Sequence, residues 1–462
     1  MRKSHSSVVI SVFALTGVLE VRSLALAETK VLLLDGGASV EANNYRFYNN
    51  TRSAYETSKS LGYSTSVYAK DGNWRVSQNS NESLSNYSLT PDGTKNQNPA
   101  GRVAQKPTYP PVQGPLRSSE DMAKAIAALN LKSGDRLLIQ MTGHGNLNEK
   151  GEPGYDFYGT NETWKTVGDA LAKVDPKVTV QIQASSCYAG GVHDLAKRFP
   201  NVCSASSTQR YSVSNSLNTG DAFTNAFWNN IKSKSGTMSF GDASVAGFKA
   251  DQQNTSQGSL SSFDYMAFVL KKSPYDQVQY KDYKKTGTYD SQYKPIFSMD
   301  PYGRDKKCNI DNVTGEVAQF TETIQALNKF TSTSNSVDPS GLQLPPGFVK
   351  MLKEQTGAED PAYQKYTAQR AKLQQEWNEH QAKFKNSWDV TKWWYDEGDK
   401  RAEIERKIYD LDTNSGIPLY DHYNLGKLKT VVDNLKEFQA KATPEQKTKL
   451  NQILACEWGT FK

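Results

Sequence analysis

The sequence of 462 residues contains few of the side chains that most often bind metals, with only four cysteines and five histidines. It has no Cys-x-x-Cys and no His-Glu-x-x-His motif, so it gives no support for a metal site or for a metal cofactor. It also has no long Lys/Arg cluster, and its formal charge is only +6. Nucleic-acid binding therefore has little support.

Long hydrophobic runs are absent after the first 27 residues. Residues 1–27 have the parts of a secretory signal: Arg2 and Lys3, an apolar stretch over 8–19, and a small-x-small site ending at Ala27. The alternative, an uncleaved anchor, is disfavoured because the apolar stretch is too short to span a bilayer comfortably. We expect an exported protein, secreted or periplasmic, with no stable membrane span after signal removal.

The length favours two compact units rather than one. Residues 28–275 alternate strand and helix patterns, which predicts an α/β fold with a mainly parallel sheet covered on both faces. A polar stretch at about 71–115 interrupts this unit and is expected to be a functional or disordered loop. Residues 276–314 are expected to be a linker, and 315–462 a C-terminal all-helical domain.

Hydrophobic patterns and capping signals give the expected elements. The expected strands cover 30–34, 63–68, 136–141, 178–184 and 201–205. The expected helices cover 43–61, 119–131, 163–174, 192–199 and 221–231. Asp360-Pro361 and Thr443-Pro444 are two further helix starts, with a cap before a first-turn proline. Five of the eight tryptophans lie in the helical part; we expect them in its core, with a glycan-binding surface as the alternative.

Two of the buried strands lead into residues that form a potential catalytic pair. The strand at 136–141 leads through Thr142-Gly143 to His144, and the strand at 178–184 leads through two serines to Cys187. Chemistry in open α/β sheets collects at the carboxyl ends of strands. A thiol and an imidazole at neighbouring strand ends are a nucleophile and its base. The N–H groups of Gly145 and Cys187 are the candidate oxyanion donors.

Each member of this pair, taken alone, favours a structural role. A lone cysteine is usually a small buried residue, and a lone His-Gly is usually a turn. Two such residues at successive strand ends, with one predicted helix between them, favour catalysis instead. His193 lies on the helix after Cys187, where we expect a solvated surface position, and the remaining histidines lie in the signal or the helical part. His144 is therefore the candidate base.

The four cysteines allow at most one disulfide if Cys187 must stay free as a nucleophile. The other three are Cys203, Cys308 and Cys456. A Cys308–Cys456 bond would tie the chain end to the start of the second half. Spacing alone does not fix the connectivity.

The order of strand, His-Gly, about forty residues, strand and Cys-x-x-Gly resembles the caspase-like (clan CD) cysteine peptidases. This group includes caspases, metacaspases, gingipain-like enzymes and legumains. The stretch from Ser185 to Gly190 is similar to the metacaspase pattern Asp-Ser-Cys-(His/Tyr)-Ser-Gly. It departs at Ser185, where metacaspases have an acid that binds a basic substrate residue. The resemblance implies a caspase-like three-layer sandwich and an enzyme without a cofactor.

Asn44-Tyr45-Arg46, followed by Ala54-Tyr55, resembles a legumain segment whose arginine lines the specificity pocket. Gly220-Asp221 is similar to a later legumain Gly-Asp whose aspartate lines the same pocket. The resemblance thus implies Arg46 and Asp221 as substrate-binding residues. Arg46 as an ordinary exposed helix residue and Asp221 as a helix cap are equally open.

Two serines complete the expected substrate site. Ser206 lies in the small polar strand that holds the substrate backbone in legumains, and Ser185 occupies the place of a legumain acid. An arginine that donates and an aspartate that accepts suit an amide side chain. The resemblance therefore implies cleavage after Asn as first choice and after Asp as second.

The expected function is an exported cysteine endopeptidase acting on protein or peptide substrates. One alternative is a transpeptidase or transamidase, in which an amine attacks the same acyl-enzyme. A second is a helical binding module on a non-catalytic α/β scaffold. By analogy with legumains, residues 315–462 are expected to act as a regulatory cap that contacts the active cleft. The Asn-rich loop 79–98 is an expected site of self-cleavage.

Overall fold

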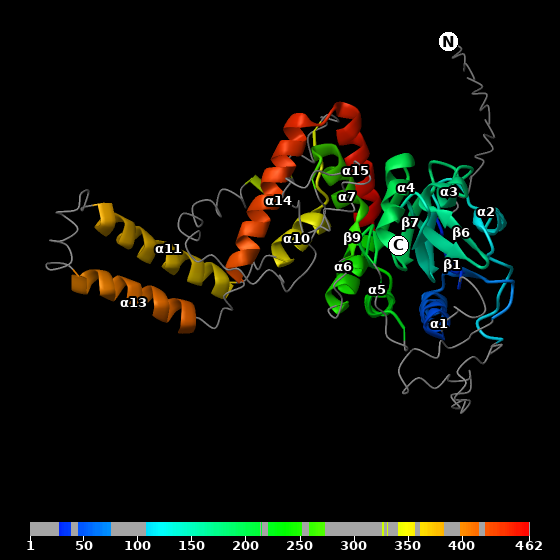
Figure 1. Ribbon diagram of the computed structural model, residues 1–462, viewed down its shortest axis with the longest axis horizontal. Coiled ribbons are helices and arrows are strands. Elements are labelled where there is room, and N and C mark those ends of the chain that lie inside the picture. Colours follow the sequence, from blue (N-terminus) through cyan, green and yellow to red (C-terminus); the bar gives the residue numbers. More distant parts are fainter. Residues whose placement is uncertain are drawn as a thin grey trace, which may run out of the picture.

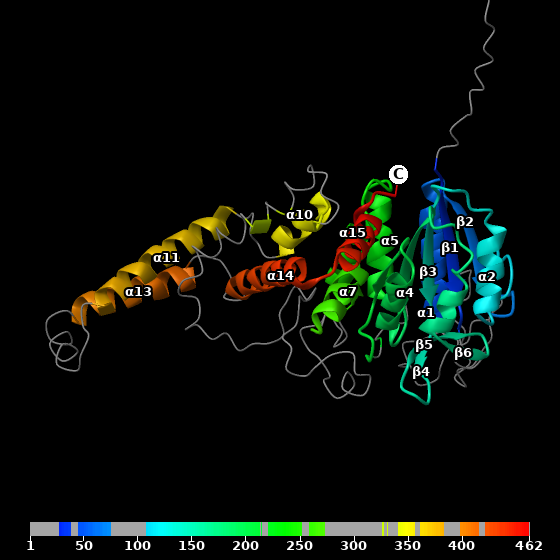
Figure 2. The ribbon, with the colours of Figure 1, turned by 90° about the horizontal axis from the view of Figure 1, so that it is seen from above.

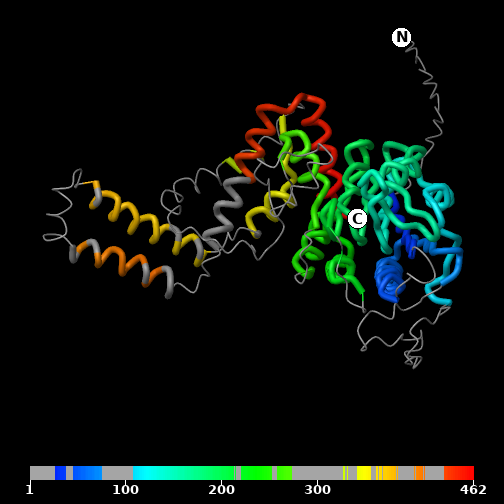
Figure 3. Tube along the Cα trace, viewed as in Figure 1, coloured from blue at the N-terminus to red at the C-terminus, as the bar shows by residue number. Residues whose placement is uncertain are grey.

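The computed structural model describes most of the α/β half of the chain and separate parts of the C-terminal half (Figure 3). The described residues are 27–37, 45–74, 108–212, 214, 220–251, 258–272, 326–327, 330, 341–355, 361–382, 398–414 and 421–461. Residues 1–26 of the expected signal, most of the 71–115 loop, the whole 276–314 linker and Cys308 lie outside them.

A six-stranded sheet with the order β2-β1-β3-β7-β8-β9 forms the centre of the fold (Figure 1). Its strands are β1 Thr29–Asp35, β2 Ser64–Ala69, β3 Arg136–Thr142, β7 Thr179–Ser185, β8 Val202–Ser206 and β9 Ser259–Leu260. Every neighbouring pair is parallel except β8 with the edge strand β9. The expected α/β fold with a mainly parallel sheet is confirmed, and all five predicted strands are present.

Helices connect and cover these strands. In the first half they are α1 Tyr45–Ser60, α2 Ser119–Ala128, α3 Trp164–Asp169, the 3₁₀ turn η1 Ala189–Val192, α4 His193–Arg198, α5 Ala222–Ser233, α6 Phe240–Ala250 and α7 Ser261–Leu270. The helix predicted over 163–174 is shorter than expected. Before it lies a second sheet that the sequence patterns did not predict, made of β4 Gly145–Leu147, β5 Pro153–Phe157 and β6 Thr160–Thr163.

The two faces of the central sheet differ in chemistry. The face that packs with α2 and α3 is apolar and consists of Leu32, Leu34, Leu137, Ile139, Met141, Val180, Ile182 and Ala184. The face toward α1, α5 and the last helix contains six buried polar side chains: Asp35, Gln140, Thr142, Gln181, Gln183 and Ser185. Because side chains alternate along a strand, both sets come from the same three strands.

The C-terminal half is helical where it is described. Its helices are α10 Pro346–Gln355, α11 Pro361–Ala382, α13 Gly398–Asn414, α14 Asp421–Lys441 and α15 Pro444–Trp458. Figures 1 and 2 show α11 and α13 side by side at the end of the molecule farthest from the sheet. The predicted start of α15 is confirmed, with Thr443 and Gln446 forming a capping box around Pro444. Trp458 is buried as expected, and Trp377 is half-buried and donates to Glu405.

Helix α15 packs on the central sheet rather than on the other C-terminal helices alone. It contacts β7, β8, α6 and α7, and Gln181 Nε2 donates to the Cys456 carbonyl over 2.7 Å. Residues 444–461 therefore share a core with the α/β unit, although the sequence patterns grouped them with the helical part.

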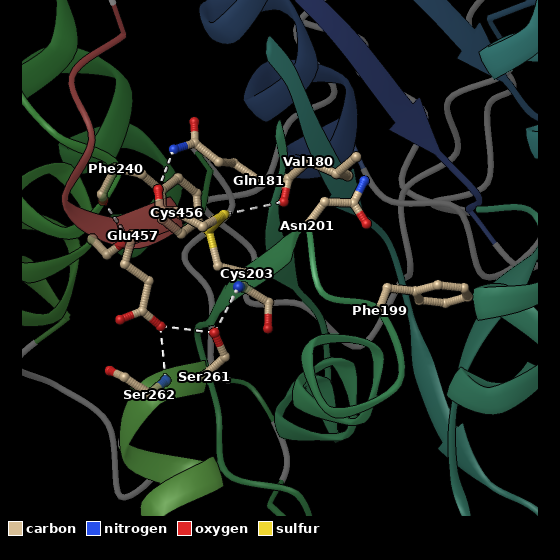
Figure 4. The surroundings of a disulfide bond; sticks show 12 residues. Val180, Gln181, Phe199, Asn201, Cys203, Phe240, Ser261, Ser262, Cys456 and Glu457 are labelled. Atoms are coloured by element: carbon tan, nitrogen blue, oxygen red, sulfur yellow. Dashed lines mark hydrogen bonds between the residues drawn. A yellow bond between two sulfur atoms is a disulfide. The ribbon is translucent and has the colours of Figure 1, made fainter. Parts of the chain in front are cut away.

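A disulfide between Cys203 on β8 and Cys456 on α15 fixes this packing (Figure 4). The suggested Cys308–Cys456 bond is therefore wrong. Cys203 points from the sheet toward α15, a contact between residues 253 positions apart that spacing cannot reveal. Cys187 is a free thiol, as the predicted nucleophile requires.

The end of the chain lies at the amino edge of the sheet. Thr29 Oγ1, at the start of β1, donates to the Phe461 carbonyl over 2.6 Å. His144 and Cys187 follow the carboxyl ends of their strands, at the opposite edge. The part of the C-terminal half that docks on the sheet therefore ends away from these two residues.

Candidate active site

Strand register brings the ends of β3 and β7 level with each other. Thr142 is the register partner of Ser185, and Asp35 at the end of β1 is the partner of Thr142. His144 lies two residues beyond Thr142, and Cys187 lies two residues beyond Ser185. Parallel pairing thus delivers the predicted base and nucleophile to the same edge at the same height.

Gly145 shows how closely the two loops approach. A Cβ atom at this position would lie 2.0 Å from the Cys187 carbonyl oxygen and 3.0 Å from Ser186 Oγ. No side chain fits there, so the residue after His144 must be glycine for its backbone to touch the backbone of Cys187. The structure therefore places the His144-Gly145 segment directly against the cysteine.

Tyr155 on β5 holds the loop that carries His144. Its hydroxyl donates to the Thr142 carbonyl over 2.6 Å and accepts from the Gly36 N–H over 2.8 Å. The N–H of the next residue, Asp156, donates to the His144 carbonyl over 3.1 Å. The β4–β6 sheet thus fastens the ends of β1 and β3 together beside the site.

The His144 ring packs against α1, with its centroid 5.0 Å from that of Phe47 in an edge-on contact. Asp35 lies near enough for the charge of His144 to act on it. Burial raises the pKa of Asp35, and the charges of Lys70 and, more weakly, His144 act in the opposite direction. The histidine is therefore on the polar face of the sheet, beyond Asp35 and Thr142.

The Cys187 thiol is largely enclosed. Burial raises its pKa, while a hydrogen bond from the Ser214 N–H (3.2 Å) and the charge of Arg46 oppose that effect. The protonated thiol is thus favoured in this structure, and a base is needed to produce the thiolate.

Tyr188, immediately after Cys187, has a left-handed backbone with φ of 57°. Such a conformation costs a non-glycine residue about 1–2 kcal/mol. It is held by hydrogen bonds from the Tyr188 N–H to Ser212 and from Trp164 Nε1 to the Tyr188 carbonyl. Strain of this kind clusters at functional sites, and here it turns the chain sharply after Cys187.

Arg46 and Asp221, the two predicted pocket residues, have different surroundings. Arg46 is half-buried in the first turn of α1, its guanidinium 5.1 Å from the Phe47 ring centroid and close enough to influence the thiol. Asp221 is buried and caps α5 through the Thr224 N–H at 3.1 Å. Its carboxylate also accepts from Ser185 Oγ. Ser185 and Asp221 thus contact each other beneath the thiol.

Ser206 ends β8 beside β7, where it is the register partner of Ala184. Its hydroxyl donates to the Thr208 carbonyl over 2.9 Å and lies 3.1 Å from His193 Nε2. His193 is fully buried, and its Nδ1 lies 2.8 Å from Ser204 Oγ. The expected surface position of His193 is therefore wrong, because α4 turns this side chain onto β8.

Several residues at the site were not identified from the sequence, among them Asn50, Thr142, Tyr155 and Ser214. Helical spacing does predict the burial of Asn50. It follows Phe47 by three residues and precedes Ala54 by four, so it shares the buried face of α1. The Ser214 contact had no signal, since it depends on a loop far along the chain.

The described residues contain no group of three or more His, Cys, Asp or Glu side chains arranged to hold a metal ion. Among the helices in the described ranges, none is long and apolar enough to cross a membrane.

No protein-family model and no curated protein matches this sequence. Among solved structures, the chain is similar to caspase-1 from Spodoptera frugiperda, with 11% identity and a TM-score of 0.33, over 51% of this chain and 86% of that one. A Geobacter sulfurreducens protein from a structural-genomics project has 11% identity and a TM-score of 0.32, over 50% of this chain and 91% of that one.

A third similar structure is a two-domain protein from Anabaena variabilis with DJ-1/ThiJ/PfpI-like and ferritin-like domains. It has 9% identity and a TM-score of 0.20, and the match covers 93% of this chain and 94% of that one. Likeness at these levels identifies no activity, so the function must be argued from the chain's own residues.

Proposed function

We propose that the protein is an exported cysteine endopeptidase that uses Cys187 as nucleophile and His144 as general base. The observation that carries this proposal is the contact between the two strand ends. Thr142 and Ser185 are register partners, and Gly145 touches the Cys187 carbonyl so closely that it admits no side chain. The disulfide between Cys203 and Cys456 supports export, since such bonds persist in oxidising compartments.

The proposed chemistry begins with the protonated thiol that burial favours. His144 accepts the Cys187 proton as sulfur attacks the peptide carbonyl, and then gives that proton to the leaving amine. The N–H groups of Gly145 and Cys187 stabilise the oxyanion. Water attacks the acyl-enzyme and releases the acid product, while attack by an amine would give transpeptidation.

We assign the preference before the scissile bond to Asn first and Asp second. The Arg46 guanidinium is near the thiol and donates to a side-chain carbonyl or carboxylate. Asp221 Oδ2 already accepts hydrogen bonds from Ser185 Oγ and from the N–H and hydroxyl of Thr224. The Oδ1 atom of Asp221 has no hydrogen-bond partner among the described residues, but it is buried, so a substrate amide N–H reaches it only if the surrounding chain opens on binding.

A peptide library tests the proposal. The chain from residue 28 onward should cleave peptides after Asn, and more slowly after Asp. Cys187→Ala and His144→Ala should each lower kcat/KM at least about 10³-fold, because the two residues act as a unit. Cys308→Ala is the matched control and should cleave like the unsubstituted chain.

Product analysis separates the competing outcomes. Cuts mainly after Lys or Arg would contradict the role of Arg46, and absence of any cleavage would contradict the peptidase. Ligated products in the presence of an added amine would instead establish acyl transfer. Purified protein should also be processed in the 79–98 loop over time, whereas Cys187→Ala should not.

A further inference from the structure

A chain of four buried polar side chains joins the end of β3 to the end of β7. Asn50 Nδ2 donates to Thr142 Oγ1 over 3.0 Å. Asn50 Oδ1 accepts from the Asp221 N–H over 2.9 Å, and Asp221 Oδ2 accepts from Ser185 Oγ over 2.5 Å. We call Thr142, Asn50, Asp221 and Ser185 the polar bridge.

The two ends of the polar bridge lie directly below the proposed catalytic pair. Thr142 precedes His144 by two residues, and Ser185 precedes Cys187 by two. Register pairing of β3 with β7 ends at Thr142 and Ser185. Beyond that point the sheet no longer fixes the separation of the two loops, so contacts from other elements must fix it.

Helix α1 supplies the central member of the bridge and also touches the catalytic histidine. Phe47, one turn before Asn50, makes the edge-on contact with the His144 ring. The α5 terminus is held by the same amide, because Asn50 accepts the N–H of its cap residue Asp221. Asn50 therefore couples the placement of α1, α5 and the two strand ends.

Burial makes this coupling strong. All four side chains are at most 4% exposed, so their hydrogen bonds do not compete with bulk water. Gln183 provides the contrast. It is also a fully buried amide that bonds to the first turn of α5, through Thr224 Oγ1 at 2.9 Å. It lies lower on β7 and contacts no bridge residue itself; it is linked to Asp221 only through Thr224, whose hydroxyl donates to Asp221 Oδ2 over 2.8 Å.

We propose that Asn50 is a positioning residue that, through the polar bridge, sets the distance between Cys187 and His144. This rests on the proposed function of the pair. The contribution is geometric: the Asn50 amide bonds to Thr142 and to the Asp221 N–H, whereas the Cys187 thiol accepts from the Ser214 N–H. The loss of Asn50 lets the strand ends separate, and misplacement of reacting groups by about 1 Å costs on the order of 10²-fold in rate.

The experiment measures two properties of the full chain from residue 28. The first is kcat and KM on an Asn-containing peptide. The second is the pH profile, from pH 5 to 9, of Cys187 alkylation by iodoacetamide, read by mass spectrometry on the Cys187 peptide. The variants are Asn50→Ala, the isosteric Thr142→Val and its conservative counterpart Thr142→Ser. Gln183→Leu is the matched control, and His144→Ala defines the profile of an uncoupled thiol.

We expect Asn50→Ala and Thr142→Val each to lower kcat by at least about 10-fold. Thr142→Val should change KM less than twofold, because Thr142 is not a proposed substrate contact. Asn50→Ala should also raise KM, because Asn50 accepts the N–H of the proposed pocket residue Asp221. Their alkylation profiles should move toward that of His144→Ala. Thr142→Ser should recover most of the rate lost in Thr142→Val, and Gln183→Leu should keep the profile of the unsubstituted chain. Thr142→Val conserves volume, so it reports on the bridge if Asn50→Ala fails to fold.

The outcomes separate this inference from the function on which it rests. If His144→Ala changes the profile but Asn50→Ala and Thr142→Val do not, the positioning role is wrong and the catalytic pair stands. If His144→Ala leaves the profile unchanged, there is no coupled pair and both proposals fail. If the bridge variants follow His144→Ala but no peptide is cleaved, the positioning role stands and the peptidase fails.

Discussion

Strands β1, β3 and β7 present chemically different side chains on the two faces of the central sheet. The face toward α2 and α3 consists mainly of aliphatic side chains, with Lys30 at its edge donating to the Leu129 carbonyl at the end of α2. The opposite face carries buried polar groups, four of which have an atom without a hydrogen-bond partner among the described residues. These atoms are Asp35 Oδ1, Gln140 Nε2, Gln181 Oε1 and Gln183 Oε1.

An unpartnered buried polar atom costs about 1–3 kcal/mol, so the polar face contributes less to stability than the apolar face. The hydrogen-bonded groups of the polar face instead bind specific partners in distant segments. Gln181 bonds to α15, Gln183 to α5 and Ser185 to Asp221, the cap residue of α5. The two faces therefore differ in role: the apolar face mainly stabilises the fold, and the polar face ties the strands to specific partners on distant helices.

The largest change in the free energy of unfolding is expected from breaking the ion pair between Asp35 and Lys70. Both residues are fully buried, and Lys70 Nζ lies 3.3 Å from Asp35 Oδ2. Lys70→Met leaves a buried carboxylate without its cation, and should lower the free energy of unfolding by about 3–5 kcal/mol. Urea unfolding measures this. Asp35→Leu combined with Lys70→Met should recover most of the loss, because an apolar pair needs no compensation. A double variant no more stable than Lys70→Met would contradict the view that polarity is costly on this face.

The apolar face and the positions of the strands along the chain follow from the sequence for a clear physical reason. Strands such as 136–141 and 178–184 are short apolar or alternating runs bounded by turn signals, and all lie within one residue of their predicted bounds. Burial on at least one face dictates such patterns locally. His144 and Cys187 could also be placed at one edge of a parallel sheet, since strand ends are local features.

The polar face could not be predicted, because its partners are far away in the sequence. The alternation in Val180, Gln181, Ile182 and Gln183 is ordinarily that of a strand with one solvated face. The structure covers that face with α5 and α15, whose positions depend on contacts such as Cys203 with Cys456. His193 was misplaced for the same reason: only tertiary packing shows that α4 turns it onto β8.

A second prediction concerns two buried titratable groups, one from the helices of each face. Burial lowers the pKa of His193 on α4 from 6.5 to about 4, although the nearby charge of Asp264 opposes this. Burial also raises the pKa of Glu457 on α15 from 4.5 to about 7, against hydrogen bonds from Ser261 and Ser262 (Figure 4). Each pKa difference between the unfolded and the folded chain corresponds to about 3 kcal/mol of unfolding free energy.

The two groups change the stability of the fold in opposite directions as the pH rises. Between pH 4 and 6.5 the unfolded chain binds the His193 proton and the folded chain does not, so this group makes stability rise with pH. Between pH 4.5 and 7 the folded chain retains the Glu457 proton and the unfolded chain loses it, so this group makes stability fall with pH. From pH 4.5 to 6.5 the contributions nearly cancel.

Single substitutions should reveal each slope. The unsubstituted chain should have nearly the same free energy of unfolding at pH 4.5 and pH 6.5. For Glu457→Gln, this free energy should rise by about 2–3 kcal/mol from pH 4.5 to pH 6.5, because only the His193 effect remains. For His193→Gln, it should fall by a similar amount over the same range. Urea unfolding at the two pH values provides the measurement, and the double variant is the control that should again be nearly flat. An unchanged slope in either single variant would show that its group does not titrate as burial implies.

The smallest effect compares adjacent residues on β7 that point to opposite faces, Ile182 and Gln183, both fully buried. Ile182→Val removes one methylene from the apolar face and should cost about 0.5–1.5 kcal/mol. Gln183→Leu removes one hydrogen bond to Thr224 but also removes the unpartnered Oε1 atom. These terms oppose each other, so its unfolding free energy should stay within about 1 kcal/mol of the unsubstituted chain. A loss larger than that of Ile182→Val would mean that the middle of the polar face stabilises the fold, and that geometry at the strand ends is only part of its role.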